Sequence, residues 1–317
     1  MRSRLSRVAA AYPELLIVLV AAGTGLALAR PLRWLDGRQG INVLLVVLVF
    51  ATAVTVSTDA LGRLRSAWPH LVATLAIGVI LLPALSWLAS RVVTAGSLRN
   101  GIMTVGLAPC EIASVATTGL AGGEPALAAA VLIGSTALSV AVAGPILSVE
   151  ASGAHVHSGH ILINLAVVVA LPLVAGLTLR AKTGITPLRE VAATNAATAA
   201  LAGLVALVAA QVHLGTAYFA VFAAIVIVIG VSAVIAALLG RTLSPQRATA
   251  LLLTISMRDF AIAAGLASAA FGPASAAPLG LYGVAVIIWG TAVAGRRRAK
   301  ATTLNSPESD GPELVDG

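Results

Sequence analysis

The sequence has 317 residues, of which few are charged or aromatic and only one is cysteine. Charged residues make up 10% of the chain and hydrophobic residues 59%, with a mean hydropathy of +1.00. Because soluble domains carry about 25% charged residues, this scarcity indicates an integral membrane protein. The single cysteine, Cys110, excludes an internal disulfide and a metal site built from cysteines. A basic stripe with interleaved aromatic residues is also missing, so we expect no nucleic-acid partner.

What the sequence does contain is long apolar runs. A membrane-spanning helix needs about 20 mostly apolar residues, and by this criterion the sequence predicts an all-α integral membrane protein with ten transmembrane helices. The expected helices are 13–30, 41–58, 69–89, 101–121, 126–148, 160–180, 191–212, 217–240, 248–271 and 278–295. They form one transmembrane domain, 1–298, and the polar, acidic residues 299–317 are expected to be a disordered cytoplasmic tail. The basic N-terminal head resembles that of a signal peptide, but further apolar runs follow at once, so we expect an uncleaved first helix.

Basic residues are concentrated in alternate links between these runs. With the N-terminus inside, fourteen Lys and Arg residues lie inside and five outside, and Arg258 falls within a run. Cytoplasmic links of membrane proteins carry such an excess. The sequence therefore predicts a multi-pass protein of the plasma (inner) membrane with both termini in the cytoplasm. Its expected partners are membrane lipid and a small-molecule or ion substrate.

A common spacing links two distant parts of the chain. Glu111 and Asp259 each lie fourteen residues before a proline, and the two pairs are offset by 148 positions. A repeat of this length contains five expected helices, an odd number, so the second copy has to insert upside down. We therefore predict two inverted five-helix repeats, about 13–150 and about 160–297. Inverted repeats whose interrupted helices cross near the membrane centre are typical of secondary transporters.

Only Glu111, Arg258 and Asp259 carry charge well inside the expected helices. Each charge at the centre of a bilayer costs about 2.5–3.5 kcal/mol, and such residues usually serve a substrate or a coupling ion. The offset pairs Glu111 with Asp259 and Cys110 with Arg258, so we expect the fourth and ninth helices to meet at this depth. Arg258 would then face Glu111 or Asp259. The alternative is a buried ion pair that only fixes helix packing.

Pro109 directly precedes Cys110 and Glu111 in the fourth expected helix. Proline lacks a backbone N–H and clashes with the preceding turn, so we expect the helix to be kinked or unwound there. The freed backbone groups must line a cavity or be buried in protein, and the next half-helix would direct its positive end at what the cavity holds. In the ninth helix, Thr254, Ser256 and Gly265 could loosen the backbone instead. A proline kink without function is the alternative.

Three segments carry a resemblance to a known family: "GLAPCEIAS" (106–114), "GGEPA" (122–126) and "SMRDFAIAAGLASAAFGPAS" (256–275). They resemble helices 4 and 9 of the bile acid:sodium symporter family and of the related arsenite permeases. With ten expected helices, the resemblance extends over 13–297. It implies a panel domain packed against a core domain, with substrate taken up between them by alternating access.

The resemblance also implies sodium ligands, most of which this chain lacks. Ser114 is present, but the asparagine expected after it is a valine, and Ala128 and Leu132 stand where serine or threonine ligands are expected. The family's helix 9 glutamate falls on Thr254, and its glutamine after methionine falls on Arg258. A fixed cation therefore stands where one sodium would be held.

Together these observations predict a secondary active transporter of a small, anionic solute. In this hypothesis Arg258 substitutes for a sodium and holds the substrate or Glu111, and protonation of Glu111 or Asp259 couples transport to the proton gradient. We expect no cofactor and no metal, and the coupling ion, proton or sodium, stays open. The expected substrate-binding or coupling residues are Pro109, Cys110, Glu111, Ser114, Thr254, Ser256, Arg258 and Asp259.

The alternative transporter is an arsenite or antimonite efflux permease that uses Cys110. A soft thiol suits arsenite, and the cysteine and helix 9 glutamate of the arsenite permeases fall on Cys110 and Asp259. We expect no enzyme: an aspartyl intramembrane protease needs motifs such as Gly-x-Gly-Asp, which are missing, and the five histidines fall at helix ends or in links, where a serine type could not use them. A channel would show conductance rather than saturable exchange.

Overall fold

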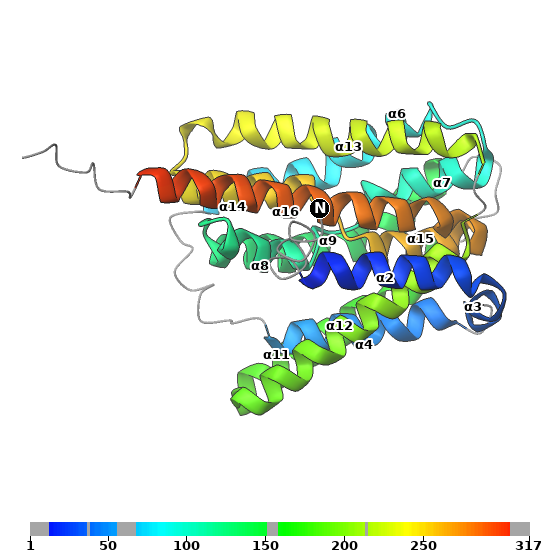
Figure 1. Ribbon diagram of the computed structural model, residues 1–317, viewed down its shortest axis with the longest axis horizontal. Helices are drawn as coiled ribbons and strands as arrows, with labels where there is room; N and C mark the ends of the chain where they lie inside the picture. Colours follow the sequence, from blue (N-terminus) through cyan, green and yellow to red (C-terminus); the bar gives the residue numbers. More distant parts are fainter. Residues whose placement is uncertain (1–12, 37–38, 56–67, 151–157, 213–214, 305–317) are drawn as a thin grey trace, which may run out of the picture.

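A computed structural model describes residues 13–36, 39–55, 68–150, 158–212 and 215–304. The regular secondary structure in this part of the chain is helix, joined by turns and short loops, apart from one isolated antiparallel bridge (Figure 1). The prediction of an all-α protein is therefore confirmed.

The helices follow the expected apolar runs in order. The first half contains α2 (Pro13–Ala27), α3 (Ala29–Asp36), α4 (Gly40–Thr55), α5 (Trp68–Ala76), the π-helical turn η2 (Ile77–Leu81), α6 (Leu82–Ser90), α7 (Gly96–Val105), α8 (Ala113–Leu120) and α9 (Pro125–Glu150). The second half contains α10 (Ser158–Leu165), the π-helical turn η3 (Ala166–Ala170), α11 (Leu171–Thr183), α12 (Pro187–Ala210), α13 (Ala217–Leu239), η4 (Gly240–Thr242), α14 (Pro245–Ser256), α15 (Phe260–Phe271), η5 (Pro273–Ala276) and α16 (Ala277–Leu304).

Several helices extend beyond the predicted runs by a few residues, and two of these extensions add new structure. The short helix α3 follows the first run, and the Nε of Arg33 on it donates a hydrogen bond of 2.7 Å to the carbonyl of Ala210. Helix α16 continues to Leu304, so the first residues of the tail expected from 299 are helical. The rest of that tail, 305–317, lies outside the described residues.

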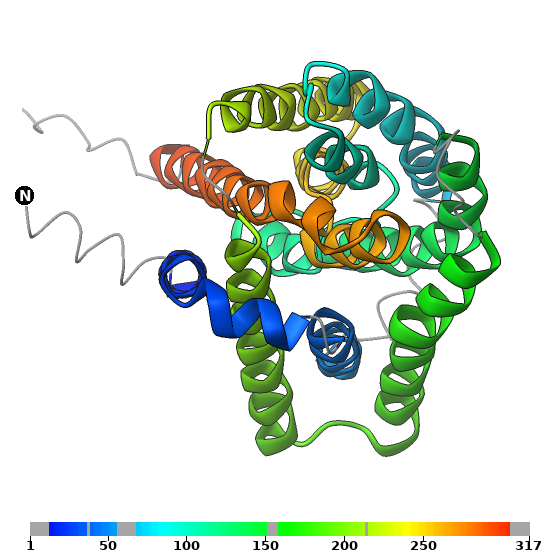
Figure 2. The ribbon, with the colours of Figure 1, turned by 90° about the vertical axis from the view of Figure 1, so that its right-hand side faces the viewer.

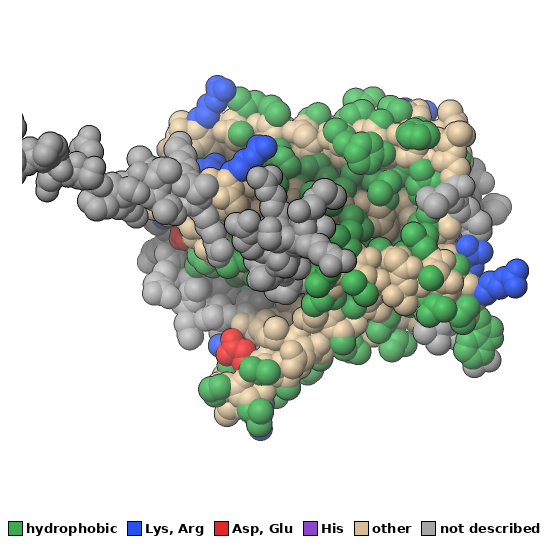
Figure 3. All heavy atoms as spheres, in the orientation of Figure 1, with side chains coloured by type: hydrophobic (Ala, Val, Ile, Leu, Met, Phe, Trp, Pro, Cys, Tyr) green, Lys and Arg blue, Asp and Glu red, His purple; other side chains and the backbone are tan. Residues whose placement is uncertain are grey.

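Among the described residues, six helical segments are long and apolar enough to cross a membrane. They are Trp68–Ser90, Pro125–Leu147, Ile163–Thr183, Pro187–Ala210, Ala217–Thr242 and Pro273–Arg297. Shorter apolar helices cover Leu16–Ala27, Gly40–Thr55 and Phe260–Phe271. Figure 3 shows hydrophobic side chains across the middle of the visible face and Lys and Arg side chains toward its ends. The prediction of a multi-pass membrane protein is therefore confirmed.

Two of the long segments contain a π-helical turn just before a proline. Pro83 follows η2 and Pro172 follows η3, each in the first turn of the next α-helix. Because proline cannot donate the backbone hydrogen bond of a regular α-helix, the turn before it widens. The helix nevertheless continues on the far side, so Trp68–Ser90 remains one spanning segment.

The helices form two groups. Helix α12 packs against α2 and α4, and α4 packs against α11. Figure 2 shows this first group, α2, α4, α11 and α12, below the other helices. The second group contains α5–α9 and α13–α16, and its interior holds the isolated bridge. The boundary between the two groups positions the site described next.

Candidate functional site

Two helical segments are interrupted and meet at their interruptions. One interruption separates α7 from α8 and the other separates α14 from α15. Cys110 and Arg258 form the antiparallel bridge between them. The N–H of Glu111 donates to the carbonyl of Met257 (2.8 Å), and the N–H of Asp259 donates to the carbonyl of Pro109 (2.9 Å). The crossing therefore satisfies backbone groups that the broken helices leave without helical partners.

Two hydroxyl groups complete the crossing. The N–H of Cys110 donates to Ser135 Oγ on α9 (3.1 Å), and the N–H of Arg258 donates to Tyr282 Oη on α16 (3.1 Å). Ser135 and Tyr282 are 147 positions apart, close to the offset of 148 between the bridged residues. The sequence prediction missed both hydroxyls, although the repeat offset was a signal that could have found them.

The crossing has two faces, and Arg258 lies on the face opposite to the carboxylates. In extended backbone, successive side chains point to opposite sides, so Arg258 points away from Glu111 and Asp259. Its guanidinium donates to the carbonyl of Ala108 and lies against Gly78 of η2. In the described part of the chain, its nitrogens have no oxygen of Glu111 or Asp259 within 4.0 Å. The expectation that Arg258 faces one of these carboxylates was therefore wrong.

Both carboxylates lie at the N-terminus of α15. Asp259 Oδ1 accepts a hydrogen bond from the N–H of Ile262 (2.8 Å) and caps the helix. Glu111 Oε2 accepts from the N–H of Phe260 at 3.4 Å. The first N–H groups of a helix lack partners within the helix and form its positive end. The protein therefore supplies its own two acidic side chains to the positive end of α15.

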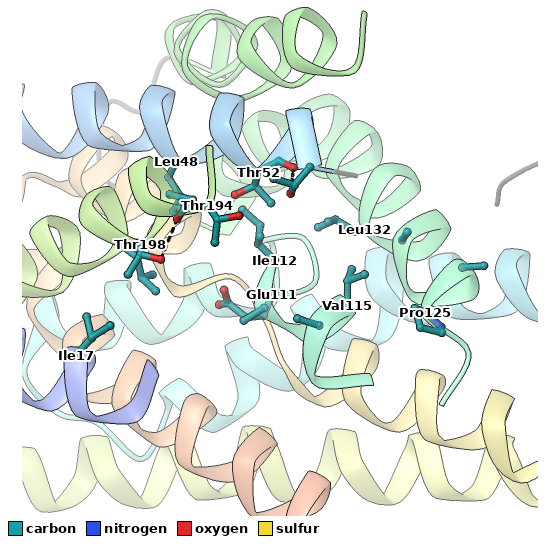
Figure 4. A pocket seen from close by; sticks show the side chains of 17 residues that line it. Ile17, Leu48, Thr52, Glu111, Ile112, Val115, Pro125, Leu132, Thr194 and Thr198 are labelled. Atoms are coloured by element: carbon teal, nitrogen blue, oxygen red, sulfur yellow. Dashed lines mark hydrogen bonds between the residues drawn. The ribbon is translucent and has the colours of Figure 1, made fainter. Parts of the chain in front are cut away.

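Glu111 also lines a cavity of about 370 Å³ between the two helix groups. The cavity is bounded by α2, α4 and α12 on one side and by α8 and α9 on the other (Figure 4). Glu111 is the one charged residue in its lining, and most of the other lining residues are apolar. The lining residues that carry hydroxyl groups are Thr52, Thr55, Thr194 and Thr198.

The sequence prediction missed these threonines. Thr194 and Thr198 are four positions apart on α12, and Thr52 and Thr55 are three apart on α4. Residues with these spacings share one face of a helix. The spacing was a usable signal, but it does not say which face borders a cavity.

Of the eight residues predicted for the site, the cavity lining includes only Glu111. Thr254 donates to a carbonyl of its own helix, and Ser256 Oγ accepts a hydrogen bond of 2.8 Å from Trp289 Nε1. Ser114 is buried in α8, and its hydroxyl has no hydrogen-bond partner in the described part of the chain. The site therefore has two parts, a backbone crossing and a cavity. Of the predicted residues, only Glu111 joins the two.

Cys110 is fully buried on the same face of the crossing as Arg258. It belongs to a buried apolar cluster that also contains Leu71, Leu82 and Leu127. Because the cavity lining does not include Cys110, the thiol is not placed to meet a solute there.

Taken together, these observations indicate the class to which the protein belongs. An all-α, multi-pass membrane protein in which two interrupted helices meet beside a cavity has the features of a membrane transporter. Residues 42–222, more than half of the chain, match the model of the Sodium Bile acid symporter family. The chain therefore belongs to this family, as the resemblance in its sequence indicated. No match was found among curated proteins.

Proposed function

We propose that the protein is a secondary active transporter that moves a small solute by alternating access through the cavity beside Glu111. The observation that carries this proposal is the position of the cavity, between two helix groups and next to a crossing of broken helices. Thr55 near the end of α4, Pro125 at the start of α9 and Thr194 near the start of α12 line it. The excess of basic residues in alternate links supports a cytoplasmic position for these helix ends, and we therefore propose that the structure corresponds to an inward-facing state.

We also propose ten spanning helices in two inverted repeats, in the inner membrane, with both termini in the cytoplasm. Two features support the repeats. The interrupted segments are paired by the offset of 148, and each bridged residue donates its N–H to a hydroxyl from the helix that follows its own interrupted pair. Shorter apolar segments such as Gly40–Thr55 would then cross as well, in contact with the longer helices.

Protons, rather than sodium, are the proposed coupling ions. Most residues that the family resemblance implies as sodium ligands are replaced, and the Arg258 guanidinium is bonded to the carbonyl of Ala108. A small space beside this guanidinium is lined mostly by apolar residues and also by Ser135 and Ser139. In this proposal the fixed positive charge of Arg258 takes the place of a bound cation. Glu111 is then the group in the cavity that can bind and release a proton.

Two expectations about the solute lose their structural basis. The anionic solute depended on Arg258 reaching the substrate, and its guanidinium lies on the opposite face of the crossing. The arsenite permease depended on Cys110 reaching the cavity, and Cys110 is buried away from it. No second function is therefore favoured.

Flux in proteoliposomes tests the proposed coupling. A panel of organic cations, organic anions and arsenite would be offered with either a proton gradient or a sodium gradient alone. We expect a proton gradient to drive saturable movement of at least one solute, and we expect Glu111→Gln to abolish this drive. A strict requirement for sodium, or proton-driven movement that persists in Glu111→Gln, would contradict the proposal.

A further inference from the structure

Glu111 is the one charged residue in the cavity lining, which contains no basic residue. Glu111 is 4% exposed, and the other lining residues are threonines and apolar residues. The other titratable groups at the crossing are Asp259, Arg258, Cys110 and Tyr282, and none of them lines the cavity. A solute in this cavity therefore meets a single carboxylate, and no arginine or lysine.

The positive end of α15, which is bonded to the cavity residue Glu111, is also occupied. An anionic solute could use the free N–H groups at a helix N-terminus. In α15 the N–H of Ile262 is bonded to Asp259, and the N–H of Phe260 is bonded to Glu111. A solute anion would have to displace these carboxylates or lie beside them, where like charges repel.

The remaining surface of the cavity suits an apolar body. Val115, Ala116 and Ala129 from one side face Leu48 and Ala197 from the other. Cavities that hold small molecules usually combine such walls with one or a few polar groups that fix orientation. A volume of about 370 Å³ limits the occupant to a small molecule.

From this combination we propose that the solute is a small amphiphilic organic cation, paired with Glu111 inside an apolar cavity. The inference names the substrate class of the transporter proposed above and rests on that function. It differs from the anionic solute predicted from the sequence, because the one charged residue in the cavity lining is Glu111.

The test compares two probes of the same shape and opposite charge, tetraphenylphosphonium and tetraphenylborate. The purified protein in detergent is titrated with each probe, and thermal shifts give apparent affinities. We expect the phosphonium to stabilise the protein and the borate to have no saturable effect. We expect Glu111→Gln to weaken phosphonium binding about tenfold or more, because the paired charge is removed from a poorly hydrated site.

Two further variants keep the test decisive. Thr198→Lys places a positive charge in the cavity lining without altering the crossing, and should also abolish phosphonium binding. Glu124→Gln removes an acidic residue paired with Arg247 (3.0 Å) outside the cavity lining, and should leave the affinity unchanged.

Three results would overturn the cation inference: saturable stabilisation by the borate, no stabilisation by the phosphonium, or phosphonium binding that survives both Glu111→Gln and Thr198→Lys. Binding is measured here without transport, whereas the flux panel includes solutes of both charges. Failure of the cation inference can therefore be separated from failure of the transporter function.

Discussion

Glu111 belongs to both parts of the site, the backbone crossing and the cavity. Its N–H closes the backbone crossing, and its carboxylate lies between the first turn of α15 and the cavity. A proton or a cation bound at this carboxylate would therefore change the net charge at the N-terminus of α15, where the broken helices meet. Arg258, by contrast, holds the other face of the crossing together through the carbonyl of Ala108.

Cys110 should be inert in the folded protein. Its side chain is fully buried in an apolar cluster, and thiol reactivity requires access to an exposed thiolate. We expect N-ethylmaleimide to modify Cys110 at least about 100-fold more slowly than a cysteine introduced at Ala116, in the cavity, in a Cys110→Ser background. Mass spectrometry over time measures both rates. Comparable rates would show that the cavity extends to Cys110 and would restore the arsenite hypothesis.

For the residues of the site, the sequence predicted which ones come together better than it predicted the directions of their side chains. Hydropathy and the repeat offset placed Glu111, Arg258 and Asp259 at one depth, and the structure brings them to one crossing. Which face each side chain takes depends on extended backbone at the interruptions, and hydropathy carries no information about that. For this reason the sequence suggested a contact between Arg258 and Glu111 that the alternation of side chains prevents.

The crossing depends on close packing by neighbouring elements. A Cβ atom at Gly106, just after α7, would lie 2.2 Å from the carbonyl oxygen of Leu82 and 2.7 Å from the Cα of Pro83. The end of α7 can therefore approach the start of α6 only because residue 106 has no side chain. This contact holds the first interruption against the segment that contains Gly78, against which the Arg258 guanidinium lies.

Gly106→Ala should therefore destabilise the protein. Overpacking of this kind costs about 1–3 kcal/mol, and we expect the apparent melting temperature to fall by roughly 2–8 °C. Gly23→Ala is the matched control, because a Cβ atom at Gly23 in α2 would meet no atom within 4 Å. The control should be neutral or slightly stabilising, since alanine favours helix more than glycine does. Equal melting temperatures for the two variants in detergent would contradict the proposed role of the close contact.

The positions of the helices could be predicted from the sequence. The two interruptions, however, have different causes. Pro109 predicts the break after α7, because proline lacks the backbone N–H that a continuous helix needs. No proline precedes α15, where Asp259 ends the extended segment and caps the new helix. An aspartate before an apolar helical run is an N-cap signal, but inside a longer apolar run it also fits a buried charge. The end of α16 at Leu304 could not be predicted from hydropathy, because those last residues are polar.

At the scale of the whole molecule, the cavity beside Glu111 lies between two helix groups. The first group, α2, α4, α11 and α12, contributes threonines and apolar side chains, and the second contributes Glu111 beside the crossing. If the groups move relative to each other, the same cavity can open to either side of the membrane, while the crossing stays intact in the second group. A mechanism of this kind needs no break of the hydrogen bonds around Cys110 and Arg258.

The most direct test of this account is the side from which the cavity can be reached. In a Cys110→Ser background, Thr198→Cys reports on the cavity, and Val226→Cys on the exposed face of α13 is the control. A membrane-impermeant maleimide is applied to inside-out and right-side-out vesicles without added solute. For an inward-facing transporter we expect Thr198→Cys to be labelled from the cytoplasmic side at least about tenfold faster than from the outside, and Val226→Cys to be labelled from neither side. Equal labelling of Thr198→Cys from both sides, or none from either side, would contradict an inward-facing transporter.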